Sequence, residues 1–324
     1  MAENMNTRAV QTDSDHARSD RDALREKADR SELVERITRA IPDDGRVEVL
    51  EGLTLHRSSK PTEPLHSVSE PALCVMAQGA KLVHLGDNHH RYDPYHYLLV
   101  TSELPIAGEI VEASRDKPYL SMILSLDANL VSSVMVEAGH PAPSNASSVR
   151  ALDVSPLDND LLSAMVRLIR LIESPDEADV IGPLIKREIV FRLLQGEQGR
   201  RLRHMAVMNG SDHRIASVIQ KLHDDFDQAM DVERLAEEVG MSTSSFYAHF
   251  KSVTDMTPLQ FQKQLRLQEA RRLMLTEDLN ASTAGYRVGY NNDAQFNREY
   301  KRLFGRPPMR DVHRLRESAD AAAF

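Results

Sequence analysis

The alternation of apolar and polar positions divides the chain into a front part with strand-like spacing and a rear part with helical spacing. Between about residues 47 and 126, turn residues separate short apolar runs such as LCVMAQGAKLVHLG, YHYLLVT and YLSMILSL. Several short strands at this spacing are typical of an antiparallel sandwich or barrel. Tyr97–Val100 is apolar on both faces and predicts an inner strand. From Pro156 onward the spacing is helical, so the sequence predicts an α+β protein.

Two helices are predicted directly after the strands. Ser155-Pro156 is a typical helix start, and the apolar residues that follow it lie on one stripe. A second helix is predicted from Pro183 to Gln195, and Gly196 is expected to end it. A helix pair that follows a barrel either packs on the barrel or forms a dimer interface, and the pattern leaves both alternatives open.

The N-terminal segment and one later loop mark the borders of these parts. Residues 1–30 are polar and charged, which predicts a disordered tail, and a short helix is expected to begin near Ser31. A loop around Asn209-Gly210-Ser211 precedes another helix, expected over Asp212–Gln228. We place the boundary of the C-terminal domain at this loop.

A sequence pattern occurs twice in the C-terminal part, first as EEVGMSTSSFYAHFKSVTDMTP and then as YRVGYNNDAQFNREYKRLFGRPP. The offset between the copies is 49 residues at the glycine and, after one inserted residue, 50. Two copies at a fixed offset are a stronger signal than one, because a single glycine turn between apolar helices is common. The matched positions are Val239, Gly240, Met241, Phe246, Phe250, Lys251 and Pro258 in the first copy and Val288, Gly289, Tyr290, Phe296, Tyr300, Lys301 and Pro308 in the second.

Each copy has the parts of a helix-turn-helix unit. The first helix needs a small residue where the second crosses it, and the turn needs a residue that tolerates positive φ. The second helix needs a capping side chain and an apolar inner face, here provided by the two aromatic residues four positions apart. The small residues are Ala236 and Gly285, the turn residues are Gly240 and Gly289, and the caps are Ser242 and either Asn291 or Asn292.

The outward faces of the two second helices carry the candidate DNA-binding residues. Asn and Arg can make paired hydrogen bonds to adenine and guanine edges, and Lys and Arg at a helix end suit phosphates. Leu259 to Leu275 reads as one helix of ~25 Å, which is comparable with a DNA turn of ~34 Å. The candidates are Ser244, Ser245, Tyr247, Ala248 and Lys251 in the first unit and Asp293, Ala294, Asn297, Arg298, Lys301 and Arg302 in the second.

The distribution of charge supports a nucleic-acid partner for this part of the chain. The formal net charge is −9, from 40 Lys+Arg and 49 Asp+Glu. Residues 241–316 hold 13 of the basic and 7 of the acidic residues, which leaves 27 and 42 for the rest. A basic module is thus joined to an acidic one with another task.

The segment from about His213 to Arg314 resembles the DNA-binding domain of the AraC/XylS family of bacterial transcription regulators. The resemblance is carried by LAEEVGMSTSSFYAHFKSVTDMTPLQF, LRLQEARRLM and YRVGYNNDAQFNREYKRLFGRPPMRD. It implies seven helices, with two recognition helices in successive major grooves. Ser244, Tyr247 and Ala248 would then face bases in the first unit. In the second unit the residues facing bases would be Asp293, Ala294, Asn297 and Arg298.

This sequence departs from the family pattern at two positions. Asp255 replaces the usual glycine between the first recognition helix and the connecting helix, which puts the local turn geometry in question. Ala248 stands where a longer polar side chain often reads a base. It suggests weaker or apolar readout in the first unit, for example of a thymine methyl group.

The front part, roughly Leu53 to Leu130, resembles the cupin-like N-terminal domain of one AraC-type subgroup, through QGAK, LGD, YD and YLL. This resemblance implies a small β-barrel for effector binding or dimerisation. The expected domains are a disordered tail (1–30), a cupin-like regulatory domain (31–154), a helical dimerisation or linker segment (155–210), a DNA-binding domain with two helix-turn-helix motifs (211–316) and a tail (317–324).

The leading functional hypothesis is a sequence-specific transcription regulator that responds to an effector. Its expected partners are double-stranded promoter DNA, RNA polymerase, an unidentified small molecule and a second copy of the chain. The alternatives are a cupin-type enzyme with an accessory DNA-binding domain and an architectural DNA-binding protein without an effector. We expect no catalytic residues and no cofactor. No apolar run approaches the ~18 residues of a membrane span, so a bacterial cytoplasmic, nucleoid-associated protein is expected.

Four histidines and one cysteine are the remaining candidates for chemistry in the front part. His84, His89, His90 and His96 do not have the His-x-His spacing with a following Glu of a metal-binding cupin, so we expect no metal. Cys74 is the only cysteine, which excludes a disulfide framework within the chain. It is interpreted either as an inert buried thiol or as a redox or electrophile sensor.

Overall fold

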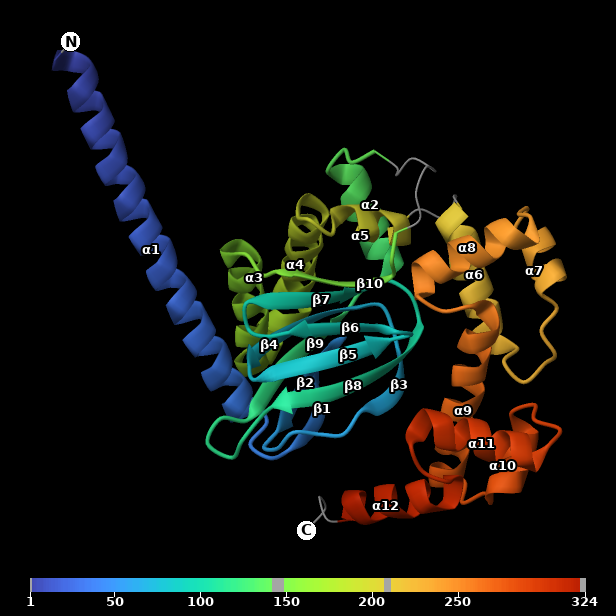
Figure 1. Ribbon diagram of the computed structural model, residues 1–324. Coiled ribbons are helices and arrows are strands. Elements are labelled where there is room, and N and C mark those ends of the chain that lie inside the picture. The colour runs from blue at the N-terminus through green and yellow to red at the C-terminus, as the bar shows by residue number, and fades with distance from the viewer. Residues whose placement is uncertain (1, 142–148, 207–210, 321–324) are drawn as a thin grey trace.

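A β-rich body, helices on one of its faces and a separate group of C-terminal helices make up the molecule (Figure 1). The computed structural model describes the backbone of residues 2–141, 149–206 and 211–320, and the side chains of residues 20–141, 149–206 and 214–317. No helix among these residues combines the length and apolarity needed to span a bilayer. The expected α+β class is confirmed.

The strands form two facing antiparallel sheets, which together we call the barrel. The six-stranded sheet has the order β1-β2-β9-β4-β7-β10, and the four-stranded sheet has the order β3-β8-β5-β6. β7 lies between β4 and β10, so the predicted inner strand is confirmed. The strands are β1 (Gly45–Leu50), β2 (Leu53–Ser58), β3 (Leu65–Ser69), β4 (Ala72–Gln78), β5 (Ala80–Leu85), β6 (Asn88–Tyr92), β7 (His96–Val100), β8 (Leu104–Glu112), β9 (Tyr119–Ser125) and β10 (Leu152–Pro156).

Alternation along the strands gives the six-stranded sheet two different faces. One face, with Leu73, Val75 and Met122, packs under the helices in one hydrophobic cluster. The opposite face looks toward the four-stranded sheet across a space that we call the lumen. Cys74, Met76 and Tyr119 face the lumen from the six-stranded sheet, and Val83, Tyr92 and Ile110 face it from the four-stranded sheet, as strand register requires.

The helices that cover the six-stranded sheet differ from the prediction at their starts. Ser155-Pro156 does not begin a helix, because both residues belong to β10 and pair with β7; the cap of the following helix is Asp158. The second helix begins at Pro175 rather than Pro183, and Gly196 ends it as predicted. The helices are α2 (Ala128–Glu137), α3 (Asn159–Arg170), the short 3-10 helix η1 (Leu171–Glu173), α4 (Pro175–Gln195) and α5 (Gly199–Ala206).

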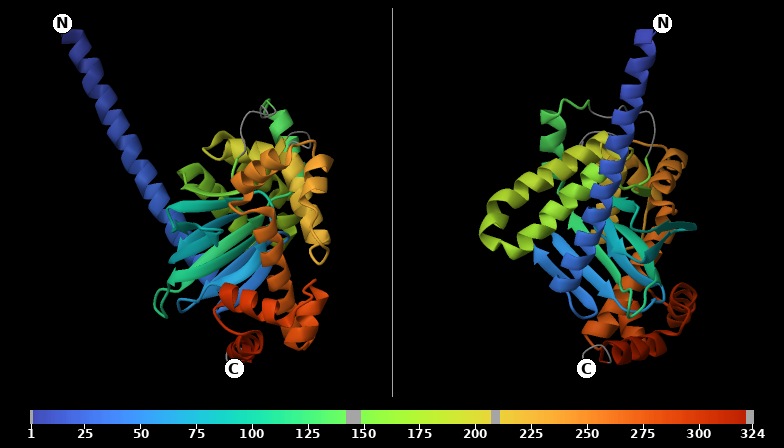
Figure 2. Two further views of the ribbon diagram at one scale, coloured as in Figure 1. Left: turned by 45° about the vertical axis from the view of Figure 1, so that its right-hand side comes forward. Right: turned by 90° about the vertical axis from the view of Figure 1, so that its left-hand side faces the viewer.

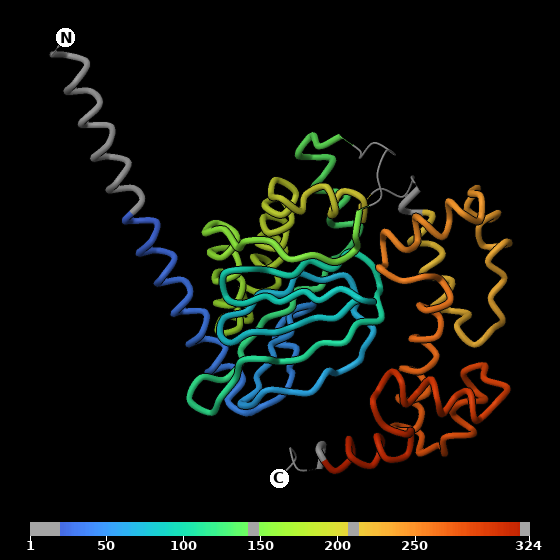
Figure 3. The backbone as a smooth tube through the Cα atoms, viewed as in Figure 1, coloured from blue at the N-terminus to red at the C-terminus, as the bar shows by residue number. Residues whose placement is uncertain are grey.

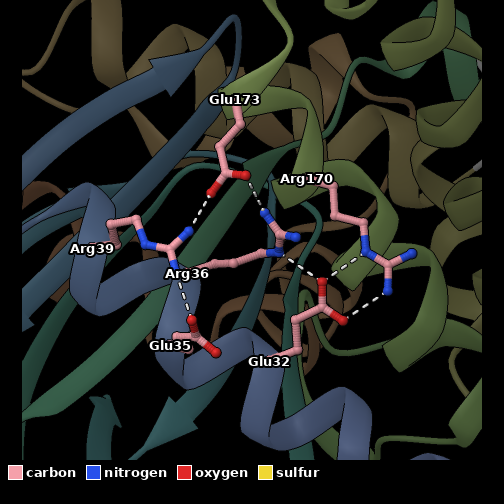
Figure 4. A network of polar contacts seen from close by, with 6 residues as sticks. All are labelled: Glu32, Glu35, Arg36, Arg39, Arg170 and Glu173. Carbon is pink, nitrogen blue, oxygen red and sulfur yellow. Dashed lines mark hydrogen bonds and ion pairs between the residues drawn. The ribbon is translucent and has the colours of Figure 1, made fainter.

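The N-terminal helix α1 (Ala2–Ala40) replaces most of the predicted disordered tail. From Asp20 on, where side chains are described, the prediction of disorder over 1–30 is wrong. Leu33 and Ile37, four residues apart, are buried against the body. Glu32 accepts two hydrogen bonds from Arg170 of α3, each 2.7 Å, and Arg36 bridges Glu32 and Glu173 at 2.6 and 2.9 Å (Figure 4). These long-range contacts hold α1 against the body, although its polar composition alone predicted a disordered tail.

The C-terminal domain is entirely helical and is organised around one long helix. In Figures 2 and 3 the chain leaves the barrel and its covering helices and enters a group in which α9 connects two smaller bundles. With 19 residues, α9 spans about 28 Å at 1.5 Å per residue. The helices are α6 (Ser211–Asp224), α7 (Val232–Glu238), α8 (Thr243–Thr254), α9 (Pro258–Thr276), α10 (Ala281–Arg287), α11 (Asp293–Phe304) and α12 (Pro308–Asp320).

The barrel and the first of these bundles share one buried apolar cluster. It contains Val100 and Leu104 of the barrel together with Phe250 and Phe261 of the C-terminal helices. The backbone N–H of Ala151 donates to the carbonyl of Val253 at 3.0 Å. Gly86, in the β5–β6 turn, approaches the α8–α9 turn so closely that a Cβ there would lie 2.6 Å from the carbonyl oxygen of Asp255. The two domains therefore form a packed contact.

Candidate nucleic-acid interface

The first helix-turn-helix unit consists of α7, a glycine turn and α8. Gly240 has φ +63°, and the Ser242 Oγ accepts from the Ser245 N–H at 3.3 Å, so the predicted turn and cap are both confirmed. Phe246 and Phe250 have no exposed surface, and Phe250 stacks edge-on with Phe261 of α9 at 5.4 Å between centroids. The two aromatic side chains thus pack the inner face of α8 against α9, so the opposite face of α8 points outward.

The second unit, α10 and α11, repeats this construction. A Cβ on Gly285 would lie 2.9 Å from the ring of Phe296, so the close crossing of the two helices requires a residue without a side chain. Of the two asparagines predicted as caps, Asn292 is the one that accepts from the Gln295 N–H, at 3.0 Å. Phe296 and Tyr300 are fully buried, as predicted.

The turn of the second unit is fixed by Arg266 of α9. Gly289 has φ +85°, and a Cβ there would lie 2.1 Å from the carbonyl oxygen of Asp227. The Arg266 guanidinium donates to the carbonyls of Phe226, Gly289 and Gln228 at 2.6, 3.1 and 2.7 Å. Burial lowers the pKa of Arg266 below its usual value. One side chain thus joins the end of the α6–α7 segment to the second turn and sets the two units relative to each other.

Asp255 keeps the backbone geometry that glycine usually supplies after α8. Its φ of 58° is in the left-handed region, and its N–H donates to the Lys251 carbonyl at 2.8 Å as the helix cap. Asp is among the residues that tolerate this conformation best after glycine and asparagine. Its carboxylate lies 3.7 Å from Arg150, so the substitution also adds a contact with the front domain.

The candidate residues of the first unit lie mostly on the exposed face of α8. Ser244, Tyr247, Ala248 and Lys251 are exposed. Ser245 is half-buried, and its hydroxyl lies 3.3 Å from His249 Nδ1. The structure brings the four exposed residues together on one side of the helix and places Ser245 toward its flank.

All candidate residues of the second unit are exposed on α11: Asp293, Ala294, Asn297, Arg298, Lys301 and Arg302. Two of them are engaged within the protein. The Asp293 carboxylate accepts from the Ser282 hydroxyl at 2.9 Å, and the Asn297 amide donates to the Asp293 carbonyl at 2.8 Å. A base contact by Asn297 would exchange this local hydrogen bond for one to the base.

The cationic candidates differ from most neighbouring arginines in having no internal partner. Within the side chains that the structure describes, Lys251, Arg298, Lys301 and Arg302 make no ion pair or hydrogen bond, whereas Arg287 is 2.6 Å from Glu277. Unpaired cations on exposed helix faces are available to phosphates without first breaking an internal contact.

Two residues of this region were not predicted from the sequence. Arg266 acts through backbone carbonyls on two separate segments, residues 226–228 and Gly289, and no local pattern indicates such contacts. Tyr286 of α10 is 76% exposed, beside the second turn. Alignment of the two copies does not single out Tyr286, because the matching residue of the first unit, Glu237, is not aromatic.

The histidines of the front domain do not assemble into a metal centre. Within the described part of the chain, no group of three or more His, Cys, Asp or Glu side chains is arranged to hold a metal ion. His84 and His89 have their Nδ1 atoms 2.7 Å apart and His84 lies 3.2 Å from Glu109. Cys74 faces the lumen, and burial raises the pKa of its thiol, which lowers its reactivity at neutral pH.

Two protein-family models match the chain. Residues 49–201 match the model described as AraC-type transcriptional regulator N-terminus. Residues 235–313 match a model described as Helix-turn-helix domain. The matches fall on the barrel with its covering helices and on the two helix-turn-helix units, respectively.

Curated relatives include the HTH-type transcriptional activator RhaS of two bacteria. RhaS of Escherichia fergusonii is 25% identical over 169 residues, which are 51% of this chain and 58% of RhaS. RhaS of Salmonella paratyphi B is 26% identical over 165 residues, 50% of this chain and 58% of RhaS. The chain thus spans a little over half the length of these relatives.

Solved structures with a similar fold include ToxT of Vibrio cholerae. ToxT from strain O395, bound to (E)-4-(8-methylnaphthalen-1-yl)but-3-enoic acid, aligns with a TM-score of 0.52 and 10% identity over 81% of this chain and 97% of ToxT. The apo form of a ToxT variant from strain SCE256 aligns with a TM-score of 0.50 and 7% identity over 84% of this chain and 98% of that chain. At such identities the likeness concerns the fold.

Proposed function

The chain belongs to the AraC family of transcriptional regulators, and we propose that it binds promoter DNA through both helix-turn-helix units and adjusts this binding to a small effector held by the barrel. The observation that carries the proposal is the pair of exposed helices, α8 and α11, on the two ends of the rigid helix α9. Both present polar side chains on their outer faces, with Lys251 on α8 and three cations on α11 that have no partner among the described side chains.

We assign base contacts mainly to α11. Asn297 and Arg298 have the side chains for adenine and guanine edges, and Lys301 and Arg302 follow one turn later toward phosphates. On α8, Ser244, Tyr247 and Ala248 supply smaller or more apolar contacts, with Lys251 toward a phosphate. Because α9 spans ~28 Å and one DNA turn is ~34 Å, the two helices suit successive major grooves on one side of the duplex.

Selection of duplexes from a random pool by the purified full-length chain tests this function. We expect an enriched site in two parts spaced by about one DNA turn. The enriched duplex should bind at least about a thousandfold more tightly than a scrambled one, in the usual range for specific recognition. Retention of the scrambled duplex with equal affinity would favour the architectural alternative.

The response to an effector requires a connection between the domains, and we propose that the Gly86–Asp255 contact provides it. A ligand that binds one arrangement of the domains more tightly shifts the population of DNA-binding geometries. Gly86→Ala should separate the two turns, because its Cβ would lie 2.6 Å from the Asp255 carbonyl oxygen. Gly52→Ala is the matched control, since Gly52 also has positive φ but its nearest neighbour would be 3.6 Å away. Hydrogen exchange of the α8–α9 turn that is equally fast in both variants would contradict the connection.

The remaining partners follow from the relatives and from one exposed surface. The RhaS proteins are described as activators, so we expect activation through contact with RNA polymerase at the nucleoid of a bacterial cytoplasm.

Val180, Leu184 and Phe191 of α4 are 66, 59 and 43% exposed, which supports α4 as the surface of a homodimer. A Leu184→Lys variant that remains a dimer by light scattering would remove this assignment.

A further inference from the structure

The barrel touches the C-terminal domain at a second place, where β3 and β8 lie against α9 (Figure 1). The ring of His66 in β3 meets the ring of Phe304, the last residue of α11, edge-on with 4.9 Å between the centroids. In the loop before β3, the Glu63 carboxylate pairs with Arg314 of α12 and lies 3.9 Å from Arg306. We call these five residues the β3 contact.

The β3 contact differs in chemistry from the apolar cluster that joins the barrel to the first helix-turn-helix unit. That cluster consists of side chains such as Leu104 and Phe250, whereas the β3 contact contains an imidazole, a carboxylate and two guanidinium groups. The guanidinium of Arg271 lies 4.4 Å over the Phe304 ring, and its Nε is buried without a hydrogen-bond partner among the described residues. Because polar and charged groups respond to protons and apolar ones do not, the two contacts respond differently to pH.

His66 belongs to a row of histidines that crosses the four-stranded sheet. It pairs in register with Ala107 of β8, and Ala107 also pairs with His84 of β5. His84 in turn pairs with His89 of β6, and their Nδ1 atoms lie 2.7 Å apart, so one of these two rings must accept a hydrogen bond from the other. Val83, next to His84, faces the lumen, so the row lies on the outer face of the sheet. His66 is the member of the row that packs against α11.

The surroundings of His66 favour its neutral form. Burial is the first cause that lowers its pKa, from 6.5 to about 4, and the positive charges of Arg271 and His84 act in the same direction. Of the charges that act on His66, only that of Asp311 favours the protonated ring. The Asp311 carboxylate already pairs with Arg271 and accepts a hydrogen bond from the Tyr300 hydroxyl. A proton on His66 therefore meets no carboxylate that is free to compensate it among the groups that act on this ring.

Proton uptake by His66 consequently favours separation of β3 from α11. A His66 that has left the contact binds a proton as the pH falls below its ordinary pKa of 6.5, whereas in the contact it does so only near the pKa of about 4. The stabilisation of the contact is therefore complete above about pH 6.5 and is lost as the pH falls toward 4. These two pKa values raise the ratio of open to closed molecules by up to about thirtyfold between about pH 7.5 and about pH 5.

We propose that the β3 contact is a proton-sensitive link between the domains, which opens when His66 takes up a proton while the apolar cluster at the first helix-turn-helix unit stays closed. The C-terminal domain then turns about the apolar cluster as one body, because α9 and Arg266 keep its two units together. Phe304 becomes exposed, and Arg306 leaves Glu63. The inference goes beyond the proposed function, because it concerns the contact between the domains and needs neither an effector nor DNA.

Hydroxyl-radical footprinting of the full-length protein at about pH 7.5 and about pH 5 tests the opening, because it reports the solvent exposure of single side chains. In the wild type, oxidation of Phe304 should rise several-fold at the lower pH, while that of the buried Phe250 in the apolar cluster should stay the same. His66→Phe keeps an aromatic ring at the contact but no group that takes up a proton, so the rise should be absent. His313→Phe is the control and should retain the rise, because it changes a histidine of α12 whose side chain is 77% exposed.

Two results of the footprinting would overturn the proposal directly. One is constant oxidation of Phe304 in the wild type across this pH range, and the other is an equal rise in His66→Phe. A rise at Phe250 as large as that at Phe304 would also overturn it, because both contacts would then open together.

A tryptophan reporter supplies a second measurement that does not depend on oxidation. The chain contains no tryptophan, so Phe304→Trp places a single indole in the β3 contact. Its emission should move to longer wavelength as the pH falls from about 7.5 to about 5, without loss of far-UV circular dichroism, and return on neutralisation. Added to this variant, His66→Lys carries a charge at neutral pH, so the emission should be shifted already at about pH 7.5. An unshifted emission with His66→Lys, or a shift that accompanies loss of helical signal, would overturn the proposal.

Discussion

The guanidinium of Arg271 lies 2.8 Å from the carboxylate of Asp311, inside the second helix-turn-helix unit and away from solvent. Asp311 has no exposed surface, and it also accepts a hydrogen bond from the Tyr300 hydroxyl at 3.0 Å. The three side chains come from α12, α9 and α11. They join α11 to the two helices behind it.

Removal of the Asp311 carboxylate should destabilise this unit strongly. In Asp311→Ala, Arg271 stays buried without its counter-charge, and breaking a buried pair in this way costs about 3–5 kcal/mol. Urea unfolding followed by circular dichroism measures the loss. Asp116→Ala, in an exposed loop of the barrel, is the control and should change stability by no more than about 0.5 kcal/mol. A small loss in Asp311→Ala would mean that the pair is replaceable by water.

Gly289 and Gly305 form a matched pair that separates backbone strain from steric conflict. Both have positive φ, +85° and +77°, but a Cβ on Gly289 would lie 2.1 Å from the Asp227 carbonyl oxygen, whereas nothing lies within 4 Å of one on Gly305. Gly305→Ala should therefore cost only the left-handed conformation, about 1–2 kcal/mol. Gly289→Ala should cost about 1–3 kcal/mol more, as overpacking does.

The same two variants should differ in DNA binding. Displacement of the α10–α11 turn from Arg266 moves α11 relative to α8, so Gly289→Ala should lose affinity for the selected duplex. Gly305→Ala should retain it. Mobility-shift titration makes the comparison, and equal affinities would show that the turn is not needed to set the spacing of the units.

Arg298 and Lys301, one turn apart on α11, should separate base recognition from phosphate binding. Arg298→Ala should weaken binding to the selected duplex by ~1–3 kcal/mol and affect a scrambled duplex far less. Lys301→Ala should weaken both duplexes about equally and lower the slope of log affinity against log salt by about 1. Titrations at several salt concentrations measure both effects. Equal losses on the two duplexes for Arg298→Ala would exclude it as a base contact.

Glu32 should make the attachment of α1 sensitive to acid. The hydrogen bonds from Arg170 are the largest of the effects that lower the pKa of Glu32 from 4.5 to about 2. Because the folded-state pKa is the lower one, the stabilisation is complete above about pH 4.5 and is lost as the pH falls toward 2. Glu32→Gln should therefore lose about 1 kcal/mol at neutral pH, a value reduced for solvent screening, and the difference should shrink in acid.

Urea unfolding at a series of pH values tests this dependence. Glu35→Gln is the control, because the Glu35 side chain is 68% exposed and pairs only with Arg39 of the same helix among the described ion pairs. The control should show a smaller difference from the wild type at every pH. A Glu32→Gln deficit that stays constant into acid would mean that the hydrogen bonds, rather than the charge, hold α1.

The features that the sequence predicted are those set by local backbone chemistry. Gly240, Gly289 and Ser242 act within a few residues of their own positions, and Phe246 and Phe296 follow helical periodicity. Such local requirements restrict the residue type at each of these positions, and the duplicated motif shows the same restriction in both copies. The candidate DNA-binding faces follow from the same periodicity, and their roles at DNA stay predictions.

The features that escaped prediction depend on partners far away in the chain. Pro156 looks like a helix start, but it pairs with His96 in β7 and so extends a strand. The α1 segment looks disordered until Arg170 and Glu173 meet its charges.

The apolar cluster shared by Val100, Leu104, Phe250 and Phe261 restricts how the sequences of the two domains can evolve. A substitution at the barrel residues of this cluster alters the surface on which α8 packs, and a substitution on the inner face of α8 alters the packing of the barrel. If the proposed roles of the two domains hold, we expect that sensing and DNA binding cannot be exchanged between relatives as independent modules. A chimera that joins this barrel to a foreign C-terminal domain would have to carry the matching helix face with it.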